Sequence, residues 1–273
     1  MSDLAVIMSV YKNDKLKFVK ESVQSILDQT FTDFDYYIVF DGPVTPDIEG
    51  YISSIGDSRI KHFRLEKNGG LAGALNFLLG KVMNNPEYKL IARMDADDIS
   101  LPSRFEKQRA FLSENMEISI VGCWYEEIDE AGKHLSYRKL PTDHDTLRKR
   151  YFTRMPFAHP SVMYRRQLIE KAGFYPTDTI LMEDNVLWGK ALKEGLRFAN
   201  LPEFLLRFRI DRDFYKRRSG LKYGWKYVQR KSELNYILDS PFYNFPLLLG
   251  KGLLMMFPSF IFKYVYIISR RYS

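Results

Sequence analysis

The stretch YKLIARMDADD, residues 88–98, is typical of a buried β-strand that ends in acidic residues. Its first part is a short apolar run of the kind found inside a sheet. Three carboxylates follow within four positions, at Asp95, Asp97 and Asp98. This cluster has two interpretations. It is a solvated turn that also caps the next helix, or it is a cation site, because hard divalent cations prefer carboxylate oxygens.

Similar units precede this strand. Short apolar runs predict strands over 4–11, 35–43 and 60–66, and a helical pattern follows each of them. The alternation predicts a Rossmann-like α/β fold, in which helices flank a mostly parallel central sheet. No internal repeat or linker interrupts residues 1–210, so they are expected to form one domain, and 211–273 a basic, aromatic and helical C-terminal extension.

The pattern of elements changes after residue 118. The run 118–129 and the EAGK turn that follows it predict a strand leading into a hairpin. A helix is expected over 145–152. Residues 159–175 predict a strand and then a helix that ends at a glycine. Residues 179–202 predict a second helix of this kind, followed by a strand.

Polar segments lie at the predicted carboxyl ends of the four parallel strands. They are Ser9–Tyr11, Asp41, Glu66–Gly70 and Asp95–Asp98. Ligands of open parallel sheets bind beyond these ends, so four independent segments indicate one binding edge. Each has an alternative: Asp41 before glycine is a common turn residue, and the glycines of Glu66–Gly70 match neither a P-loop nor a dinucleotide fingerprint.

Two further features could carry chemistry. Glu183 and Asp184 begin an apolar helical stripe, where they either complement the helix dipole or supply a general base. His159 is one of four histidines and is either structural or close to a ligand. The scarcity of histidine and the single cysteine, Cys123, exclude a zinc site, and a serine hydrolase would need a G-x-S-x-G elbow.

The formal net charge of +7 suggests an anionic partner, and the positive charge is concentrated in 207–218 and 222–231. The tail 241–273 is strongly apolar and aromatic, but its uninterrupted runs are shorter than the roughly 20 residues of a spanning helix. We expect it to contact a membrane surface; the alternative is a helix that packs on the domain or on another subunit. One cysteine and the lack of a signal-peptide pattern predict the cytoplasm.

The chain resembles family 2 glycosyltransferases with the GT-A fold in segments that occur in order over residues 4–210: VIMSVYKND, IVFDG, NGGLAGALN, RMDADDISLPSRFEKQ, HPSVMYRR and MEDNVLW. It looks most similar to bacterial exopolysaccharide, capsule and lipopolysaccharide enzymes of this family, including the amylovoran type. These share the RMD-x-DD form and a late KRR-G segment.

The resemblance implies a nucleotide-sugar site with these members: Ser9, Val10, Tyr11, Asp41, Gly70, Arg93, Asp95, His159 and Arg209. Arg93 and Asp95 would hold the base and the ribose, and His159 would lie near the metal or the acceptor. Asp41 would accept a hydrogen bond from uracil. Asp97, with Asp95, would bind the Mn²⁺ or Mg²⁺ that bridges the two phosphates. Asp184 would be the base that deprotonates the acceptor hydroxyl, supported by Glu183, while Asp98 would support the turn or cap the following helix.

One departure from the family concerns the late loop. Many relatives have a histidine two residues after an arginine there, and it contacts the diphosphate or the metal. This chain has Arg207 and Arg209 without a histidine. Arg209, Arg217 or Arg218 is therefore expected to bind the diphosphate instead.

The resemblance implies a metal-dependent, inverting glycosyltransferase at the inner face of a bacterial plasma membrane. It would move a sugar from a nucleotide-diphosphate sugar to a lipid-linked saccharide. UDP is the expected nucleotide, because Asp41 suits uracil, and GDP and dTDP are the alternatives. Two alternatives are a nucleotidyltransferase, which would need a glycine-rich loop after the first strand, and a non-catalytic module that binds nucleotides or nucleic acid. The basic residues are not interleaved with aromatics as in a single-strand platform, so we expect no nucleic-acid partner.

Overall fold

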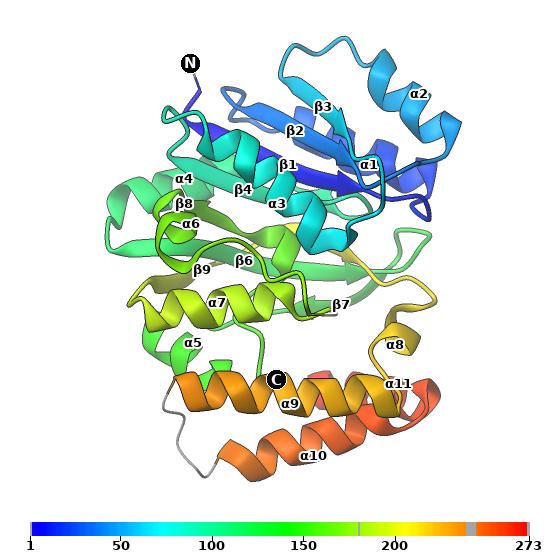
Figure 1. Cartoon of the computed structure of the whole chain (residues 1–273), viewed down its shortest axis with the longest axis vertical. Coiled ribbons are helices and arrows are strands. Elements are labelled where there is room, and N and C mark those ends of the chain that lie inside the picture. Colours follow the sequence, from blue (N-terminus) through cyan, green and yellow to red (C-terminus); the bar gives the residue numbers. More distant parts are fainter. Residues whose placement is uncertain (1, 180, 239–243, 272–273) are drawn as a thin grey trace.

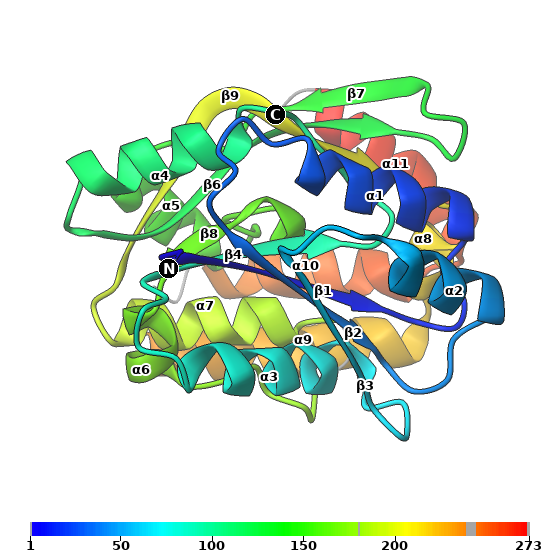
Figure 2. The same cartoon turned by 90° about the horizontal axis from the view of Figure 1, so that it is seen from above.

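The computed structural model describes residues 2–179, 181–238 and 244–271. Within these residues the chain forms one nine-stranded sheet with helices on both faces (Figures 1 and 2). The strand order is β3-β2-β1-β4-β8-β6-β9-β5, and β7 pairs with β6. The strands are β1 (Leu4–Val10), β2 (Asp35–Phe40), β3 (Ile60–Arg64), β4 (Leu90–Asp95), β5 (Ile99–Ser100), β6 (Ile118–Ile128), β7 (His134–Arg138), β8 (Met163–Arg165) and β9 (Arg197–Arg209).

The helices of the N-terminal half follow the predicted alternation. Figure 2 shows α1 and α4 on one side of the sheet and α3, α6 and α7 on the other. The helices that flank the sheet are α1 (Leu16–Leu27), α2 (Pro46–Ser54), α3 (Gly70–Met83), α4 (Arg104–Glu114), α5 (His144–Tyr151), α6 (Gln167–Ala172) and α7 (Glu183–Lys193). A short 3₁₀ turn, η1 (His159–Ser161), precedes β8.

Alternating side chains of β1 build the two cores. Val6 and Met8 face the cluster that includes α1 and α4, whereas Ala5 and Ile7 face the cluster that includes α3 and α7. Successive residues of a strand point to opposite faces, so a strand buried on both faces is apolar throughout. This explains why the predicted strands are continuous apolar runs. Each of the first four is confirmed, and the three after β1 end a few residues earlier than predicted.

The second half of the sheet is mixed. β6 and β7 form the predicted hairpin, and β6 also pairs in parallel with the distant β9. β8 inserts between β4 and β6 and is antiparallel to both. The longest pairings remain parallel. The predicted α/β fold with a mostly parallel central sheet is therefore confirmed.

The C-terminal residues form four helices in the described chain: α8 (Phe214–Arg217), α9 (Leu221–Ile237), α10 (Phe245–Met256) and α11 (Ser259–Arg271). Figure 1 shows α7, α9 and α10 as successive layers, with α10 farthest from the sheet. A Cβ added to Gly224 of α9 would lie 2.8 Å from the carbonyl oxygen of Gly252 in α10, so these glycines allow close packing of the two helices.

The predicted membrane-contacting segment, 241–273, includes 241–243 and 272–273, which lie outside the described residues. In the part that the structure describes, no helix combines the length and the apolarity that crossing a bilayer requires. One face of α10 packs on α9, as the alternative interpretation expects, while other apolar side chains of α10 are exposed.

Candidate active site

The strand register brings the predicted polar segments to one edge of the sheet. Ser9 of β1 lies directly opposite Asp95 of β4. On the other side, Val10 lies opposite Phe40, the last residue of β2, so that Asp41 follows at the same edge. The spatial grouping predicted for Ser9–Tyr11, Asp41 and Asp95 is therefore present in the structure.

Asp41 connects the end of β2 to the glycine turn before α3. Its carboxylate is buried and accepts hydrogen bonds from the Asn68 side chain at 2.9 Å and from the Gly69 N–H at 2.6 Å. Gly70 begins α3 with a φ of 74°, a left-handed value that favours glycine. A carboxylate has about four lone-pair sites, so Asp41 can accept a further bond from a ligand.

Arg93 is a buried cation with unused donors. Its side chain is 1% exposed and forms an ion pair with Asp95 through one terminal nitrogen. Its Nε and its other terminal nitrogen have no hydrogen-bond partner among the described residues. Buried donors without a partner are rare and require an explanation. These two donors could bind an acceptor-rich ligand, such as a ribose or a phosphate.

The acidic cluster at the end of β4 is compact. One carboxylate oxygen from each of Asp95, Asp97 and Asp98 lies within 4.8 Å of the others. Burial, followed by the charges of Asp95, Asp14 and Asp211, raises the pKa of Asp97 to about 7. Neighbouring carboxylates that repel one another are stabilised by a cation, and a set of oxygen ligands suits Mg²⁺ or Mn²⁺. These residues therefore fit a divalent cation.

Sequence reasoning assigned no role to Asp14 or Asp211. Asp14 accepts a hydrogen bond from the Tyr11 N–H at 2.7 Å, which holds it beside the end of β1. Burial raises the pKa of Asp14 to about 6, and Asp95 adds to this effect. Asp211 pairs with Arg217 at 2.7 Å, while its other carboxylate oxygen is buried without a partner. The sequence could have indicated both acids, because each one closely follows a strand that ends at the site.

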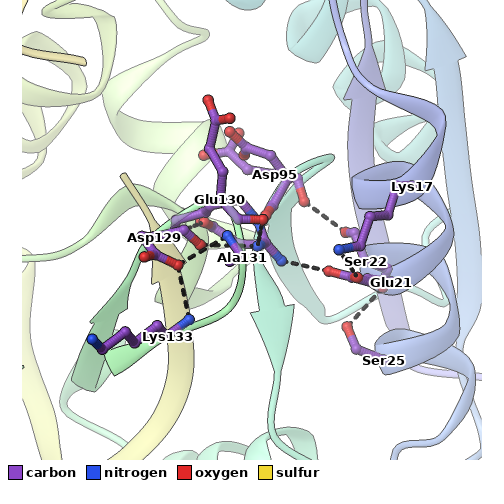
Figure 3. A network of polar contacts seen from close by, with 12 residues as sticks. Lys17, Glu21, Ser22, Ser25, Asp95, Asp129, Glu130, Ala131 and Lys133 are labelled. Carbon is purple, nitrogen blue, oxygen red and sulfur yellow. Dashed lines mark hydrogen bonds and ion pairs between the residues drawn. The ribbon is translucent and has the colours of Figure 1, made fainter. Parts of the chain in front are cut away.

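Arg209, which is predicted to bind the diphosphate, is held by protein groups in the structure. Its side chain is 1% exposed and pairs with Glu21 of α1. Its Nε donates to the Asp97 carbonyl at 2.8 Å, and another nitrogen donates to the Asp129 carbonyl at 3.1 Å. Figure 3 shows that Glu21 of α1 and Asp129 of the β6–β7 hairpin belong to the same network of polar contacts. Arg209 therefore holds the acidic turn in place, and four of its five N–H donors are bonded to protein groups.

Asp98 supports the turn and does not cap the next helix. Its Oδ1 accepts from the Arg209 main-chain N–H at 2.7 Å. The residue before α4 is Ser103, whose side chain makes no capping bond. Asp95 is anchored in a related way, because the Ser22 hydroxyl of α1 donates to its carbonyl at 2.7 Å (Figure 3).

Glu183 and Asp184 form the first turn of α7. Burial, followed by the charge of Glu183, raises the pKa of Asp184 to about 7, although the Asn185 N–H, Arg93 and Arg218 oppose the shift. Burial also raises the pKa of Glu183, on which both Arg93 and Asp95 act. The charge of Arg93 therefore acts on the acids at the start of α7 as well as on those at the end of β4. A carboxylate with a pKa close to the working pH suits a general base.

His159 lies near α7 and close enough to Arg93 for its charge to act on the imidazole. Its Nε2 is 2.9 Å from the Tyr175 hydroxyl, and its ring is 6.1 Å from that of Trp188 in α7. Burial, followed by the charge of Arg93, lowers its pKa well below the usual value, so the imidazole is neutral. The structure thus places His159 close to the site and gives it a structural partner as well.

Comparison with known proteins supports a common origin for this arrangement. Residues 5–173 match the family described as Glycosyl transferase family 2. An uncharacterized glycosyltransferase of Haemophilus influenzae is 34% identical over 96% of this chain and 97% of its own length. The Escherichia coli UDP-Gal:alpha-D-GlcNAc-diphosphoundecaprenol beta-1,3-galactosyltransferase is 35% identical over 81% of this chain and 78% of its own. The Erwinia amylovora amylovoran biosynthesis glycosyltransferase AmsE is 32% identical over 84% and 83%.

Two groups of solved structures share the fold. The mannosyltransferase PcManGT from Pyrobaculum calidifontis, in complex with GDP-Man and Mn²⁺, has a TM-score of 0.64 and 18% identity over 92% of this chain and 73% of its own. S. aureus TarS 1–349, in complex with UDP-GlcNAc, has a TM-score of 0.63 and 16% identity over 96% and 83%. At these identities the likeness establishes the GT-A fold alone.

Proposed function

Since the chain belongs to glycosyl transferase family 2, we propose that it is an inverting glycosyltransferase that uses a UDP-sugar. The acceptor is a hydroxyl of a lipid-linked saccharide in bacterial surface polysaccharide synthesis. The E. coli relative is named for a UDP-sugar donor and a diphosphoundecaprenol-linked acceptor, and the Erwinia relative for amylovoran biosynthesis. These names support the proposed classes of donor and acceptor.

One observation carries the proposal: acids from two distant parts of the chain lie close enough to the buried Arg93 for its charge to act on both. Asp95 and Asp97 come from the end of β4, and Asp184 comes from α7. Asp95 and Asp97 can bind a cation, and the carboxylate of Asp184 can act as a general base. A transferase of this class needs both, one on the leaving-group side and one on the acceptor side.

Asp95 and Asp97 would hold the Mn²⁺ or Mg²⁺, which when bound acts as a Lewis acid on the departing diphosphate. The two unused donors of Arg93 would bind the nucleotide. Ser9, Val10 and Tyr11 would line the base, with the remaining acceptor sites of Asp41 directed to uracil. The backbone at Gly70 would lie beside the donor, and His159 beside the acceptor.

Asp184 would take the proton of the acceptor hydroxyl, whose oxygen forms the new bond to the anomeric carbon while the bond to the diphosphate breaks. Attack on the face opposite the leaving group inverts the anomeric centre. Glu183 supports this step because its charge keeps the pKa of Asp184 high and so makes the carboxylate a stronger base.

The proposal also assigns a role to each of the two parts of the chain. Residues 1–210 form the nucleotide-sugar-binding and catalytic domain, and 211–273 form the extension. The extension keeps the enzyme at the inner face of the plasma membrane, where a lipid-linked acceptor lies, with 241–273 in contact with the membrane surface. The exposed apolar side chains of α10 support this placement.

A panel of nucleotide-sugars tests the donor class by thermal shift, with and without Mn²⁺. A ligand that binds only the folded state raises the unfolding temperature, so a UDP-sugar should do so when Mn²⁺ is present. Transfer to an acceptor and the configuration of the product, followed by NMR, test the reaction. Retention of the anomeric configuration would exclude the single displacement. A lack of response to every nucleotide-sugar would exclude the donor class.

A further inference from the structure

Helix α10 is mostly apolar, and the described residues cover one side of it while another side stays exposed. Leu248, Gly252 and Met255 are buried against α9 and its neighbours. Leu253 and Phe257 lie on the opposite side and are 58% and 50% exposed. A helix that is apolar all round is normally buried, either in a protein or in a membrane. The uncovered side, with Leu249, Leu253 and Phe257, is called here the α10 stripe.

Other large apolar side chains of the extension are exposed as well. Trp225 of α9 is 66% exposed, and Phe260 of α11 is 71% exposed. Exposed apolar patches of this kind mark interaction surfaces. Figure 1 shows α10 at the outer edge of the molecule, so the fold leaves this side open to a partner.

The charge of the chain is unevenly divided. Residues 211–273 contain 12 of the 41 Lys and Arg and 4 of the 34 Asp and Glu, which gives the extension a formal net charge of +8. The remaining residues, 1–210, carry −1. The net positive charge of the protein therefore belongs to the part that also exposes the apolar side chains.

A second basic segment reaches the same end of the molecule from the catalytic domain. Lys251 of α10 donates to the Thr153 carbonyl at 2.8 Å, and Lys231 of α9 donates to the Tyr151 carbonyl at 2.7 Å. Both bonds fix the C-terminal end of α5 against the extension. The cations around this end are called the α5 basic cluster: Arg148, Lys149, Arg150 and Arg154.

All four side chains of the α5 basic cluster are exposed. In the described parts of the chain, none of them has a carboxylate within ion-pair distance. A cavity of about 50 Å³ beside them is lined by Arg150, Arg154 and Lys139, and by no acidic residue. Clustered cations that no protein anion neutralises are suited to phosphate oxygens.

We propose that the α10 stripe and the α5 basic cluster form one docking surface for an anionic phospholipid bilayer. The α10 stripe enters the interfacial layer, and the α5 basic cluster binds headgroup phosphates. The proposal rests on the proposed function, since it specifies the membrane contact assigned there to 241–273 and adds a contact from the catalytic domain.

The combination of charge and apolarity favours a bilayer over the other occupants. Nucleic acid would satisfy the cations but would leave the α10 stripe in water. A second copy of the chain in a symmetric dimer would place the same positive surface against itself, because a two-fold interface uses one patch twice, and like charges oppose association. An anionic bilayer accommodates both features.

Co-sedimentation of the full-length protein with lipid vesicles tests the proposal. One set contains phosphatidylcholine alone, and in the other about a third of the lipid is phosphatidylglycerol. Removing three charges with Arg148→Gln, Lys149→Gln and Arg150→Gln should weaken binding to the anionic vesicles by about tenfold or more. The matched control removes three exposed charges with Lys20→Gln in α1, Lys81→Gln in α3 and Lys89→Gln just before β4, and should bind within about twofold of the parent.

The apolar half of the surface is tested with Leu253→Ser, which should also weaken vesicle binding. Equal binding to the two vesicle types, or equal binding by the α5 variant and its control, would overturn the proposal. So would a dimer in sedimentation velocity that Leu253→Ser dissociates. Displacement from vesicles by inorganic phosphate, at constant ionic strength, would show a site for the free anion and not for a lipid surface.

The two proposals fail in different ways. Donor binding by thermal shift, and transfer to a water-soluble acceptor without vesicles, should be the same in the α5 variant and the parent. If the parent binds no nucleotide-sugar, the proposed function fails whatever the vesicles show. If donor binding and transfer are normal but vesicles do not bind, only the docking surface fails.

Discussion

The main-chain N–H of Arg209 donates to the Asp98 carboxylate at 2.7 Å, across 111 positions of the sequence. The side chain of the same arginine pairs with Glu21 and donates to the Asp97 carbonyl. The last strand of the sheet therefore fixes the acidic turn on two sides. The positions of Asp97 and Asp98 thus depend on Arg209.

Replacing Arg209 should destabilise the protein more than it affects any single binding step. Arg209→Ala leaves the Glu21 carboxylate and several buried carbonyls without their donor. Loss of such contacts costs about 2–3 kcal/mol in the free energy of unfolding. Urea unfolding measures this. The control is Arg207→Ala on the same strand, because Arg207 is 48% exposed and its pair with Glu126 is worth less than about 1 kcal/mol. Equal losses in the two variants would contradict the role assigned to Arg209.

Asp97→Asn should separate cation binding from stability. The substitution removes one of three carboxylates that repel one another, so the metal-free protein should unfold at the same temperature or a higher one. Mn²⁺-dependent binding of a UDP-sugar should fall by about 100-fold, in line with the loss of a metal-site residue. Titration calorimetry measures the binding, with the exposed Asp28→Asn as a control. Full donor binding by Asp97→Asn would exclude the metal role.

The strands of the sheet were predictable because both of their faces are buried. Val6 and Ala5 belong to different cores, so the whole run of β1 had to be apolar. The grouping of Asp41 with Asp95 followed from the same rule, since parallel strands bring their carboxyl ends to one edge. The antiparallel insertion of β8 was not predictable, because its position depends on pairing with two strands distant in the sequence.

The burial of Arg209 was not predictable for a related reason. The sequence shows the charge of an arginine but not its burial, and an arginine near a phosphate site suggests a ligand. Burial of Arg209 depends on contacts with α1 and with the β6–β7 hairpin, which no local pattern reveals. The close packing of α9 on α10 was hidden in the same way, because Gly224 and Gly252 have no side chain to form a pattern.

The pH dependence of the reaction rate should follow the protonation of the Asp184 carboxylate. Its pKa of about 7 means that the carboxylate is protonated, and inactive as a base, at lower pH. The rate should therefore fall by about tenfold for each pH unit below 7. Because the charge of Glu183 raises the pKa of Asp184, Glu183→Gln should lower that pKa and move the acidic limb of the pH–rate profile to lower pH. An unchanged limb would contradict the coupling. Asp184→Asn should lower the turnover by about 10²–10⁴ while donor binding is retained.

Two glycines of α10 should respond in opposite ways to the same substitution. A Cβ at Gly252 would collide with Val228 of α9, so Gly252→Ala should push the helices apart. Gly250 has no atom near its added Cβ and is exposed, so Gly250→Ala should stabilise α10 by about 0.5–1 kcal/mol. Hydrogen exchange of the α10 amides measures both effects. Exchange should become faster in Gly252→Ala and slower in Gly250→Ala, because only the first substitution disturbs the contact with α9. Faster exchange in both variants would mean that the α9–α10 contact does not determine the stability of α10. It would also contradict the role of Gly252 in allowing close packing of the two helices.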